Sequence, residues 1–356
     1  MGELTAISSS LDIDKELEEL IKKQNSRVKV FGVGGGGGNT ISRMRETGIK
    51  GAELIGVNTD AQDLLYTNAD NKILIGKELT QGLGAGSNPK IGEEAARESE
   101  QDVKKALTDA DLVFITCGLG GGTGTGAAPV IAELAKKQGA LTIGVVTMPF
   151  TIEGKRRIEN ANYGLERMSQ YVDTLIIIPN DKLLEIAPEL PLKTAFKIAD
   201  EILTNAVKGI TELITKTGLV NLDFADVKAV MTNGGVSLIG LGESDSSNRA
   251  IEAVEKALNN PLIDVDVRNA SGALINIIGG PDLSLDEAKA IIDKVGSQLS
   301  EDAKLIWGAQ ISEDMEKTIK VMLIITGVKS NQIIGTKLED ELEEPISNEL
   351  GISFYS

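Results

Sequence analysis

Short apolar runs in the first half of the chain alternate with longer segments whose apolar residues recur at helical spacing. Runs that are apolar on both faces are typical of strands buried in a parallel sheet, because helices cover both sides of such a sheet. The pattern predicts an α/β domain with a doubly covered, Rossmann-like parallel sheet. The predicted strands are Val28–Val33, Ala52–Val57, Lys72–Ile75, Asp111–Thr116, Leu141–Thr147 and Thr174–Pro179, with helices that include Ile91–Leu107 and Ile158–Tyr171.

The longest helical pattern, Lys193–Lys216, has apolar residues on more than one face. A helix that is apolar on most sides is buried, and ~24 residues would span ~36 Å, so we expect a central helix between two domains. Shorter strand and helix patterns follow and predict a smaller α+β domain with a mostly antiparallel or mixed sheet. The predicted organisation is an N-terminal arm (1–26), a nucleotide-binding domain (27–192), the central helix (193–217), the second domain (218–328) and an acidic flexible tail (329–356).

A glycine-rich stretch, Cys117–Gly126, lies between the predicted strand that ends at Thr116 and a helical pattern from Ala127 to Gln138. Glycines lack a Cβ atom and tolerate positive φ, so their backbone N–H groups can converge on an anion. The helix that follows would direct its positive N-terminal end toward the same point. The stretch therefore predicts a phosphate-binding loop, although it does not match the Walker A pattern.

Two further glycine loops follow predicted strands. Gly34–Asn39 comes directly before a helix predicted over Thr40–Glu46, and Gly82–Pro89 comes before a helix that begins near Ile91. Gly32, Gly34 and Gly37 also fit the dinucleotide pattern G-x-G-x-x-G, with Asp60 as the acid for the ribose. Three glycine loops at one sheet edge are more than a dinucleotide requires and favour a triphosphate held from several sides.

Composition restricts the class of ligand and partner. The 356 residues include 36 basic and 53 acidic side chains, for a net charge of −17, which disfavours nucleic acid and direct membrane binding. A polyanionic ligand would be held mainly by backbone amides, hydroxyls and a counter-cation. The single cysteine, Cys117, excludes an intrachain disulfide, and the lack of a long apolar run or signal-peptide pattern predicts a cytoplasmic protein.

The chain contains no histidine. This excludes Ser-His-Asp and Cys-His catalysis and the common zinc sites. Hydrolysis of a triphosphate would have to depend on carboxylates, amides and a hard cation such as Mg²⁺.

From about Val28 to Thr326 the order of motifs resembles FtsZ, the family of tubulin-like prokaryotic cell-division GTPases, with a tail of archaeal type. The motifs are Gly34–Asn39, Asn58–Asp60, Gly82–Gly86, Gly120–Gly126, Glu153 with Arg157, Asn180–Asp181 and Asn221–Asp226. The resemblance implies a GTP-binding domain, a central helix, a second domain and head-to-tail filaments that form the division ring.

The resemblance also implies which residues contact GTP or GDP. The glycine loops would hold the phosphates, Glu153 and Arg157 would lie at the ribose, and Asn180, Phe196 and Asp200 would contact the base. A carboxylate at Asp200 suits guanine, whose N1–H and N2–H₂ groups it can accept together. The implied residues are Gly34, Gly35, Gly36, Gly37, Gly38, Asn39, Asn58, Asp60, Ala85, Gly86, Gly120, Gly121, Gly122, Thr123, Gly124, Thr125, Gly126, Glu153, Arg157, Asn180, Phe196 and Asp200.

The implied catalytic residues, Asn221, Asp223 and Asp226, lie beyond the central helix. About 24 Å of helix separates Asp200 from Lys216, so this loop is expected to act on GTP bound by the next subunit of a filament. The two aspartates would orient the attacking water, while Mg²⁺ neutralises the phosphates. In other proteins such a loop is a turn or a helix cap, and a solvated charge pair is the simpler role for Glu153 and Arg157.

Two other functional classes are open to the sequence: a tubulin-like regulator that does not hydrolyse GTP, and a dinucleotide-dependent oxidoreductase. The first would lack Asp223 or Asp226, and the second would need a nicotinamide site for which no candidate residues are present. The tail ends in Leu350–Ser356, which we expect to bind a membrane anchor or another division protein at the division site.

Overall fold

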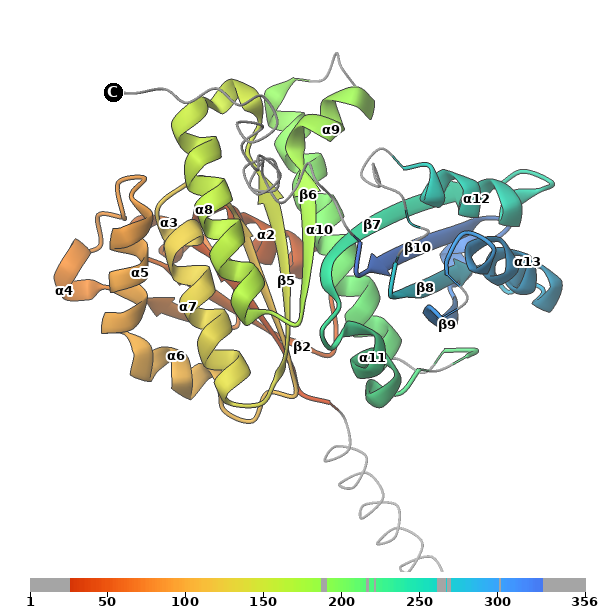
Figure 1. Ribbon diagram of the computed structural model, residues 1–356, viewed down its shortest axis with the longest axis horizontal. Coiled ribbons are helices and arrows are strands. Elements are labelled where there is room, and N and C mark those ends of the chain that lie inside the picture. The colour runs from red at the N-terminus through yellow and green to blue at the C-terminus, as the bar shows by residue number, and fades with distance from the viewer. Residues whose placement is uncertain are drawn as a thin grey trace, which may run out of the picture.

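The computed structural model describes residues 26–186, 191–215, 218–220, 222–260, 267, 270–300 and 302–328 (Figure 1). Three predictions lie outside these residues: most of the N-terminal arm, the tail from residue 329, and Asn221. Within the described part, no helix is both long and apolar enough to cross a membrane.

The described strands form one sheet of ten, in the order β3-β2-β1-β4-β5-β6-β7-β10-β8-β9. Neighbouring strands from β3 through β7 are parallel, β10 is antiparallel to both β7 and β8, and β8 is parallel to β9. The first six strands lie as predicted, within a few residues at their ends. The strands are β1 (Val28–Val33), β2 (Ala52–Asn58), β3 (Asn71–Leu74), β4 (Leu112–Gly118), β5 (Leu141–Met148), β6 (Thr174–Pro179), β7 (Gly235–Ser244), β8 (Gly272–Gly279), β9 (Lys304–Ile311) and β10 (Ile319–Thr326).

Helices cover both faces of the parallel half, as the apolar runs predicted. Alternate residues of one strand enter different cores: Phe31 and Val33 pack toward α5, α6, α7 and α8, whereas Val28 and Val30 pack toward α2 and α10 (Figure 1). The helices are α2 (Gly34–Glu46), α3 (Ala61–Tyr66), α4 (Lys77–Thr80), α5 (Pro89–Glu98), α6 (Glu100–Leu107), α7 (Thr123–Lys137), α8 (Lys155–Tyr171), α9 (Asn180–Ile186), α10 (Leu192–Thr215), α11 (Phe224–Met231), α12 (Arg249–Leu258) and α13 (Leu285–Gly296).

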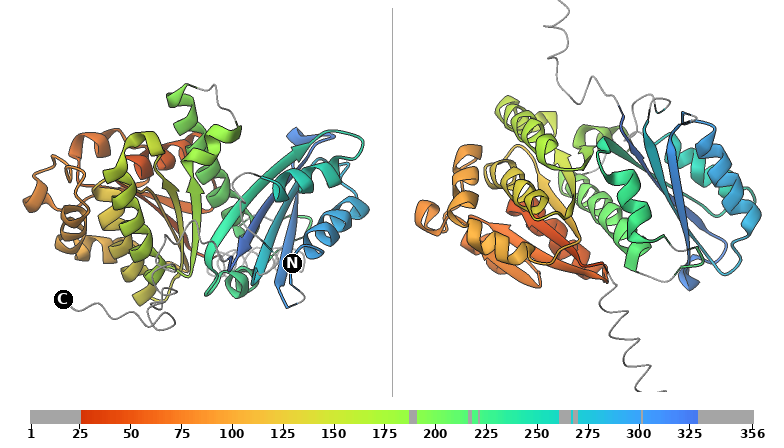
Figure 2. Two further views of the ribbon diagram at one scale, coloured as in Figure 1. Left: turned by 45° about the horizontal axis from the view of Figure 1, so that its top comes forward. Right: turned by 60° about the horizontal axis from the view of Figure 1, so that its bottom comes forward.

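Helix α10 lies between the two halves of the molecule (Figure 2). Its buried residues, among them Ala206, Val207 and Ile210, share one core with β1, β4, β5 and β6 on one side and with Leu274 and Ile324 of the second half on the other. The opposite face of the second sheet half packs against α12 and α13 in a separate core. The prediction of a buried central helix is therefore confirmed, with bounds one residue earlier than expected.

Three predictions of helix bounds are wrong by more than a few residues or miss a break in the helix. Helix α2 begins at Gly34 rather than Thr40, and α7 begins at Thr123 rather than Ala127, so part of each glycine loop is helix. The helix predicted over Ile91–Leu107 is divided at Ser99 into α5 and α6. Glycine suppresses a helix prediction because of its high backbone entropy, but tertiary packing overrides that preference here.

Candidate nucleotide-binding site

A cavity of about 460 Å³ lies at the carboxyl ends of the parallel strands, where α2 and α7 begin. Ligands of open α/β sheets bind at this edge. The sequence-predicted residues that line it are Gly34, Gly35, Gly36, Asn39, Gly121, Gly122, Thr123, Gly124, Glu153, Arg157, Asn180, Phe196 and Asp200. The structure thus brings together residues from the glycine motifs Gly34–Asn39 and Cys117–Gly126, the start of α8 and the first half of α10.

The first turns of α2 and α7 contact each other at the cavity. Gly34 has φ of +71°, and a Cβ atom on it would lie 2.9 Å from the backbone nitrogen of Gly124. The unpaired N–H groups and positive dipole ends of two helices therefore converge on the same space, which suits a polyphosphate. Part of each of these glycine loops is itself the first turn of a helix, so the predicted helix N-termini begin within the loops and lie closer to the cavity than expected.

The opposite end of the cavity suits a purine base. The side chain of Phe196 is partly exposed, and its ring meets that of Phe150 edge to face, with centroids 5.2 Å apart. Asn180 is 4% exposed, and its Oδ1 atom has no hydrogen-bond partner among the described residues. An unpartnered buried amide oxygen is costly, so a donor from a ligand would stabilise it.

Asp200 lies beside these residues on α10, and Thr40 Oγ1 of α2 donates a hydrogen bond to its Oδ1 atom at 3.1 Å. Burial raises the pKa of the Asp200 carboxyl to about 6, against the opposing effects of that hydrogen bond and the positive charge of Arg43. The ionised carboxylate is therefore in an environment that a ligand donor would stabilise.

Glu153 and Arg157 form a local unit at the rim. Arg157 Nη1 donates to Glu153 Oε2 at 2.6 Å, and Glu153 Oε1 accepts from the backbone N–H of Phe150 at 2.9 Å. The pair thus stabilises the turn before α8, and the Glu153 side chain is only 16% exposed, so it is not the solvated charge pair that the sequence also allowed. Because both residues also line the cavity, this role is compatible with contact to a ligand.

Nine of the predicted contacts do not line the cavity, and several have a packing or capping role instead. Asp60 is the N-cap of α3 and accepts from the N–H groups of Gln62 and Asp63, while the Asn58 amide donates to Asp63. Thr125 is fully buried, and its hydroxyl oxygen accepts from the Gly120 N–H. The nine are Gly37, Gly38, Asn58, Asp60, Ala85, Gly86, Gly120, Thr125 and Gly126.

Six residues that line the cavity are absent from the predicted contacts: Val33, Gly118, Leu119, Thr147, Pro149 and Ala199. Gly118 and Leu119 belong to the predicted phosphate-binding loop Cys117–Gly126, although neither was singled out as a contact. The first five lie at or just after the carboxyl ends of strands β1, β4 and β5. Their position at a strand end was the available signal, and it could have been read from the predicted strand bounds.

The predicted catalytic aspartates belong to the start of α11, with Asp226 in its first turn, and α11 lies at the other end of α10 (Figure 1). Both are exposed; Asp223 is the N-cap of α11, and its Oδ1 accepts from the Asp226 N–H at 2.8 Å. The cap role that the sequence allowed is therefore present. About 22 Å of helix separates Asp200 from Thr215, so the structure does not bring these aspartates to the cavity of the same chain.

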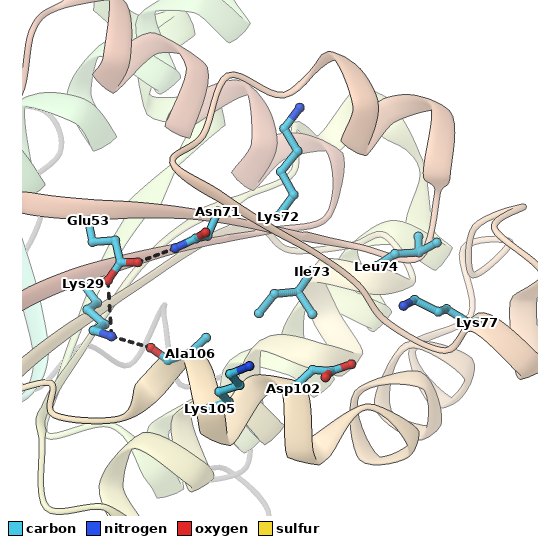
Figure 3. Close-up of a pocket in the computed structure, with 10 residues that line it drawn as sticks. All are labelled: Lys29, Glu53, Asn71, Lys72, Ile73, Leu74, Lys77, Asp102, Lys105 and Ala106. Carbon is cyan, nitrogen blue, oxygen red and sulfur yellow. Dashed lines mark hydrogen bonds and ion pairs between the residues drawn. The ribbon is translucent and has the colours of Figure 1, made fainter.

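A second cavity of about 430 Å³ lies near the amino ends of β1 and β2, between β3 and α6. Figure 3 shows that Glu53 interacts with both Lys29 and Asn71 in it, while Lys29 Nζ also donates to the Ala106 carbonyl at 2.7 Å. The side chain of Lys72 points away from this group. The buried charge of Lys29 is thus already compensated, which leaves the first cavity as the better ligand site.

Comparisons with known proteins agree with this geometry. Residues 27–188 match the Tubulin/FtsZ family, GTPase domain, and residues 235–329 match the FtsZ family, C-terminal domain. The chain is 60% identical over 334 residues to cell division protein FtsZ 1 of Thermococcus kodakarensis, covering 94% of this chain and 89% of that protein. It is 61% identical over 317 residues to cell division protein FtsZ 1 of Methanocaldococcus jannaschii, covering 89% and 87%.

Solved structures give the same result. An empty FtsZ dimer from M. jannaschii superposes with a TM-score of 0.85 at 60% identity, covering 88% of this chain and 92% of that one. A GTPγS-bound protofilament of CetZ2 from Haloferax volcanii matches with a TM-score of 0.73 at 22% identity, over 88% and 96% of the two chains, which supports the fold alone. The chain belongs to the FtsZ family of tubulin-like cell-division GTPases, whose nucleotides are GTP and GDP.

Proposed function

We propose that this protein assembles head to tail into GTP-dependent filaments of the division ring, and that each subunit supplies catalytic residues to the GTP of its neighbour. The observation that carries the proposal is the separation of the two candidate sets. The nucleotide cavity is at one end of α10, and Asp223 and Asp226 are exposed at the other. A subunit that cannot bring both sets together alone can do so across a heterologous contact that repeats.

In this proposal the first turns of α2 and α7 bind the phosphates through their backbone N–H groups. Asn180 and Asp200 contact guanine, with the ring of Phe196 beside the base. An ionised Asp200 accepts from guanine N1–H and N2–H₂, which adenine cannot offer, so the site would select GTP over ATP. Contact of GTP with the nine predicted residues that do not line the cavity remains a proposal.

Mg²⁺ fits the donor chemistry of the cavity. Asn39 and Thr147 line it with neutral oxygen atoms, the ligand type that Mg²⁺ accepts together with phosphate oxygens and water. When bound with GTP, Mg²⁺ would neutralise charge on the phosphates. The residues of the chain would bind and orient the nucleotide, and Asp223 and Asp226 of the neighbouring subunit would orient the attacking water, with help from Asn221.

The two ends of the molecule also carry exposed apolar side chains that suit a contact between subunits. Leu65 and Tyr66 of α3 are 68% and 77% exposed, and Leu83 is 82% exposed, all after strands that end at the cavity edge. Leu219, near the catalytic aspartates, is 66% exposed. Burial of these groups in a filament would contribute about 25 cal/mol for each Å² of apolar area.

The test compares Asp223→Asn and Asp226→Asn with Asp302→Asn. Asp302 is an exposed aspartate just before β9, and Lys304 at the start of β9 donates to the Ala229 carbonyl of α11, so this control makes the same charge change near the same helix. We expect the first two variants to bind GTP normally and to release phosphate at least tenfold more slowly. Equal loss of GTP binding in both would contradict the proposal.

A mixing experiment tests catalysis between subunits. Asp226→Asn retains the cavity, and Asp200→Ala retains the aspartates at the other end, so a mixture should recover turnover that neither variant has alone. Turnover per subunit should also fall on dilution of the unaltered protein, with light scattering falling in parallel. Turnover that stays constant on dilution would overturn the proposal.

We also propose that the protein is cytoplasmic, concentrates at the division site, and binds a membrane anchor or another division protein through Leu350–Ser356. The support is the sequence of that segment, which is apolar and aromatic after an acidic stretch. Deletion of residues 350–356 should abolish recruitment of a labelled protein to the division site and leave its GTPase activity intact. Unchanged recruitment would exclude this segment as the attachment point.

A further inference from the structure

The hydroxyl of Thr40 joins the two ends of the nucleotide cavity. Thr40 is fully buried on α2, and its Oγ1 atom lies 3.1 Å from the Gly36 carbonyl oxygen and 3.1 Å from Asp200 Oδ1. Gly36 lines the cavity in the turn that faces the phosphate end, and Asp200 lines it at the base end. One side chain thus contacts both halves of the site without lining the cavity itself.

A hydroxyl has one proton to donate and two lone pairs that accept. When Asp200 is ionised, Thr40 can donate to the carboxylate, and this charge-assisted bond is the stronger of its two options. When Asp200 is protonated, its own O–H can donate to Thr40 Oγ1, and the Thr40 proton is then free for the Gly36 carbonyl. The ionisation of Asp200 therefore decides which acceptor the Thr40 proton serves.

The described arginine side chains around Asp200 are paired with other acids, and they do not donate a hydrogen bond to its carboxylate. On α2, Arg43 forms ion pairs with Glu46 at 3.0 Å and with Glu201 of α10 at 2.5 Å, so its charge is largely shared with those two acids. The Glu153 and Arg157 pair lines the same cavity but is held locally. Among the described residues, Thr40 is the side chain that donates a hydrogen bond to the Asp200 carboxylate.

We propose that Thr40 is a positioning residue for guanine selection: its hydroxyl orients the ionised Asp200 carboxylate toward the base and couples it to the Gly36 carbonyl in the first turn of α2. This inference rests on the proposed base-reading role of Asp200. Loss of the hydroxyl leaves the carboxylate free to rotate and removes a bond that lowers its pKa.

The test measures dissociation constants for GTP and for inosine triphosphate, which has guanine's N1–H but lacks its exocyclic amine. Thr40→Val keeps the shape of the side chain and removes the hydroxyl. We expect it to weaken GTP binding about tenfold and inosine triphosphate binding less, so that discrimination between them falls. The pH midpoint below which GTP binding is lost should move upward, because the pKa of Asp200 rises without its donor.

Two matched variants separate this role from simple support of the helix. Thr40→Ser retains the hydroxyl and should restore both discrimination and the pH midpoint. Ser42→Ala removes an equivalent bond within α2, from Ser42 Oγ to the Gly38 carbonyl at 2.9 Å, together with the bond that Ser42 Oγ accepts from the Asn68 N–H at 3.0 Å, and should change neither. Equal weakening of both nucleotides by Thr40→Val with an unchanged pH midpoint, or failure of Thr40→Ser to restore them, would overturn the inference.

Asp200→Asn distinguishes this inference from the proposal on which it rests. If Asp200→Asn retains full discrimination between the two nucleotides, the base-reading role of Asp200 is wrong. If Asp200→Asn loses discrimination while Thr40→Val retains it, only the role of Thr40 is wrong.

Discussion

Gly32 of β1 and Gly37 of α2 are in direct backbone contact: a Cβ atom on Gly32 would lie 2.4 Å from the Gly37 carbonyl oxygen. The contact is reciprocal, because a Cβ on Gly37 would lie 2.6 Å from the Gly32 carbonyl carbon and 2.6 Å from the Thr116 carbonyl oxygen of β4. The helix thus lies against two strands at a separation that only glycine permits, and this brings its first turn to the cavity.

Gly37→Ala should therefore destabilise the protein, although alanine is the better helix former. The three atoms nearest to its Cβ all belong to the backbone, which cannot move aside cheaply, so we expect a loss of about 1–3 kcal/mol in the free energy of unfolding. The measurement is urea unfolding without nucleotide. Gly296→Ala at the end of α13, where the new Cβ would only approach Leu305 at 3.9 Å, should leave the midpoint unchanged or raise it.

The same contact explains which part of the fold the sequence could not predict. The strands of the parallel half were predictable because helices cover both faces of the sheet, so these strands are continuous apolar runs in the sequence. The helical state of Gly34–Gly38 was not, because it comes from packing against β1 and β4 rather than from local preference. Likewise, the β6–β7 pairing extends over only three residue pairs, Thr174–Gly235 to Ile176–Ser237, too few to leave a pattern in the sequence.

The ionised Asp200 carboxylate should lower the free energy of unfolding of the nucleotide-free protein. Its carboxyl pKa is about 6 in the folded protein against 3.8 for an ordinary aspartate, so the folded state binds more protons between these values. The free energy of unfolding should then fall as pH rises from about 4 to 6. We expect Asp200→Asn without nucleotide to be more stable by about 1–2 kcal/mol at pH 7.5 and equally stable at pH 4. Chemical unfolding at the two pH values measures this, with Asp302→Asn as the control.

GTP binding should show the opposite dependence on pH. Below about pH 6 Asp200 is protonated, so in its proposed role it no longer offers two acceptor oxygens to guanine N1–H and N2–H₂, and the dissociation constant for GTP should rise as pH falls from 7 to 5. Titration calorimetry across this range measures the change. A dissociation constant that is flat across the range would show that the ionised carboxylate does not contribute to binding.

Arg249 connects α12 to Glu287 of α13 and to Asp282 in the segment before α13. Its side chain is 10% exposed and forms ion pairs with Asp282 at 2.6 Å and Glu287 at 2.7 Å, and it holds the pKa of Glu287 down at about 2. Because that pKa is lowered, the stabilisation is present above about pH 4.5 and is lost as pH falls toward 2. Arg249→Met should cost about 1–3 kcal/mol at pH 7 and flatten the acid limb of the stability curve.

The control for Arg249 is Lys155→Met, which removes one partner of an exposed pair. The side chains of Lys155 and Glu159 are 90% and 63% exposed, so solvent screens their attraction. We expect no measurable change in the free energy of unfolding at either pH. A loss at Lys155 equal to that at Arg249 would mean that the effect comes from net charge rather than from the ion pairs of the buried Arg249 side chain.

The two exposed aspartates of the α11 loop should differ in their effect on stability. Asp223→Ala removes the N-cap of α11 and should cost about 1 kcal/mol, whereas Asp226→Ala leaves the backbone donor of that cap in place and should cost less than ~0.5 kcal/mol. Asp223→Asn keeps a capping side chain and should restore the stability but not the turnover. Measurements of unfolding and of phosphate release on the same variants distinguish the capping role of Asp223 from its proposed catalytic role.

The candidate site was partly predictable for a similar reason. Residues at the ends of parallel strands must meet at one edge, so the glycine motifs and Asn180 could be assigned to one cavity from order alone. The order of the motifs along the chain does not reveal which residue of a motif faces the cavity. Asn58 is the last residue of β2 and Asp60 follows it, but Asp60 caps α3 and the Asn58 amide donates to Asp63 of α3.

Helix α10 is packed in a shared core along its length. It therefore fixes both the distance between the groups at its two ends and the angle between them about the helix axis. Each residue of an α-helix advances ~1.5 Å and turns ~100° about the axis. One residue inserted between Asp200 and Thr215 would therefore move Asp223 little along the molecule but swing it to a different side. Lengthening this helix is compatible with the orientation of both ends only in steps close to whole turns.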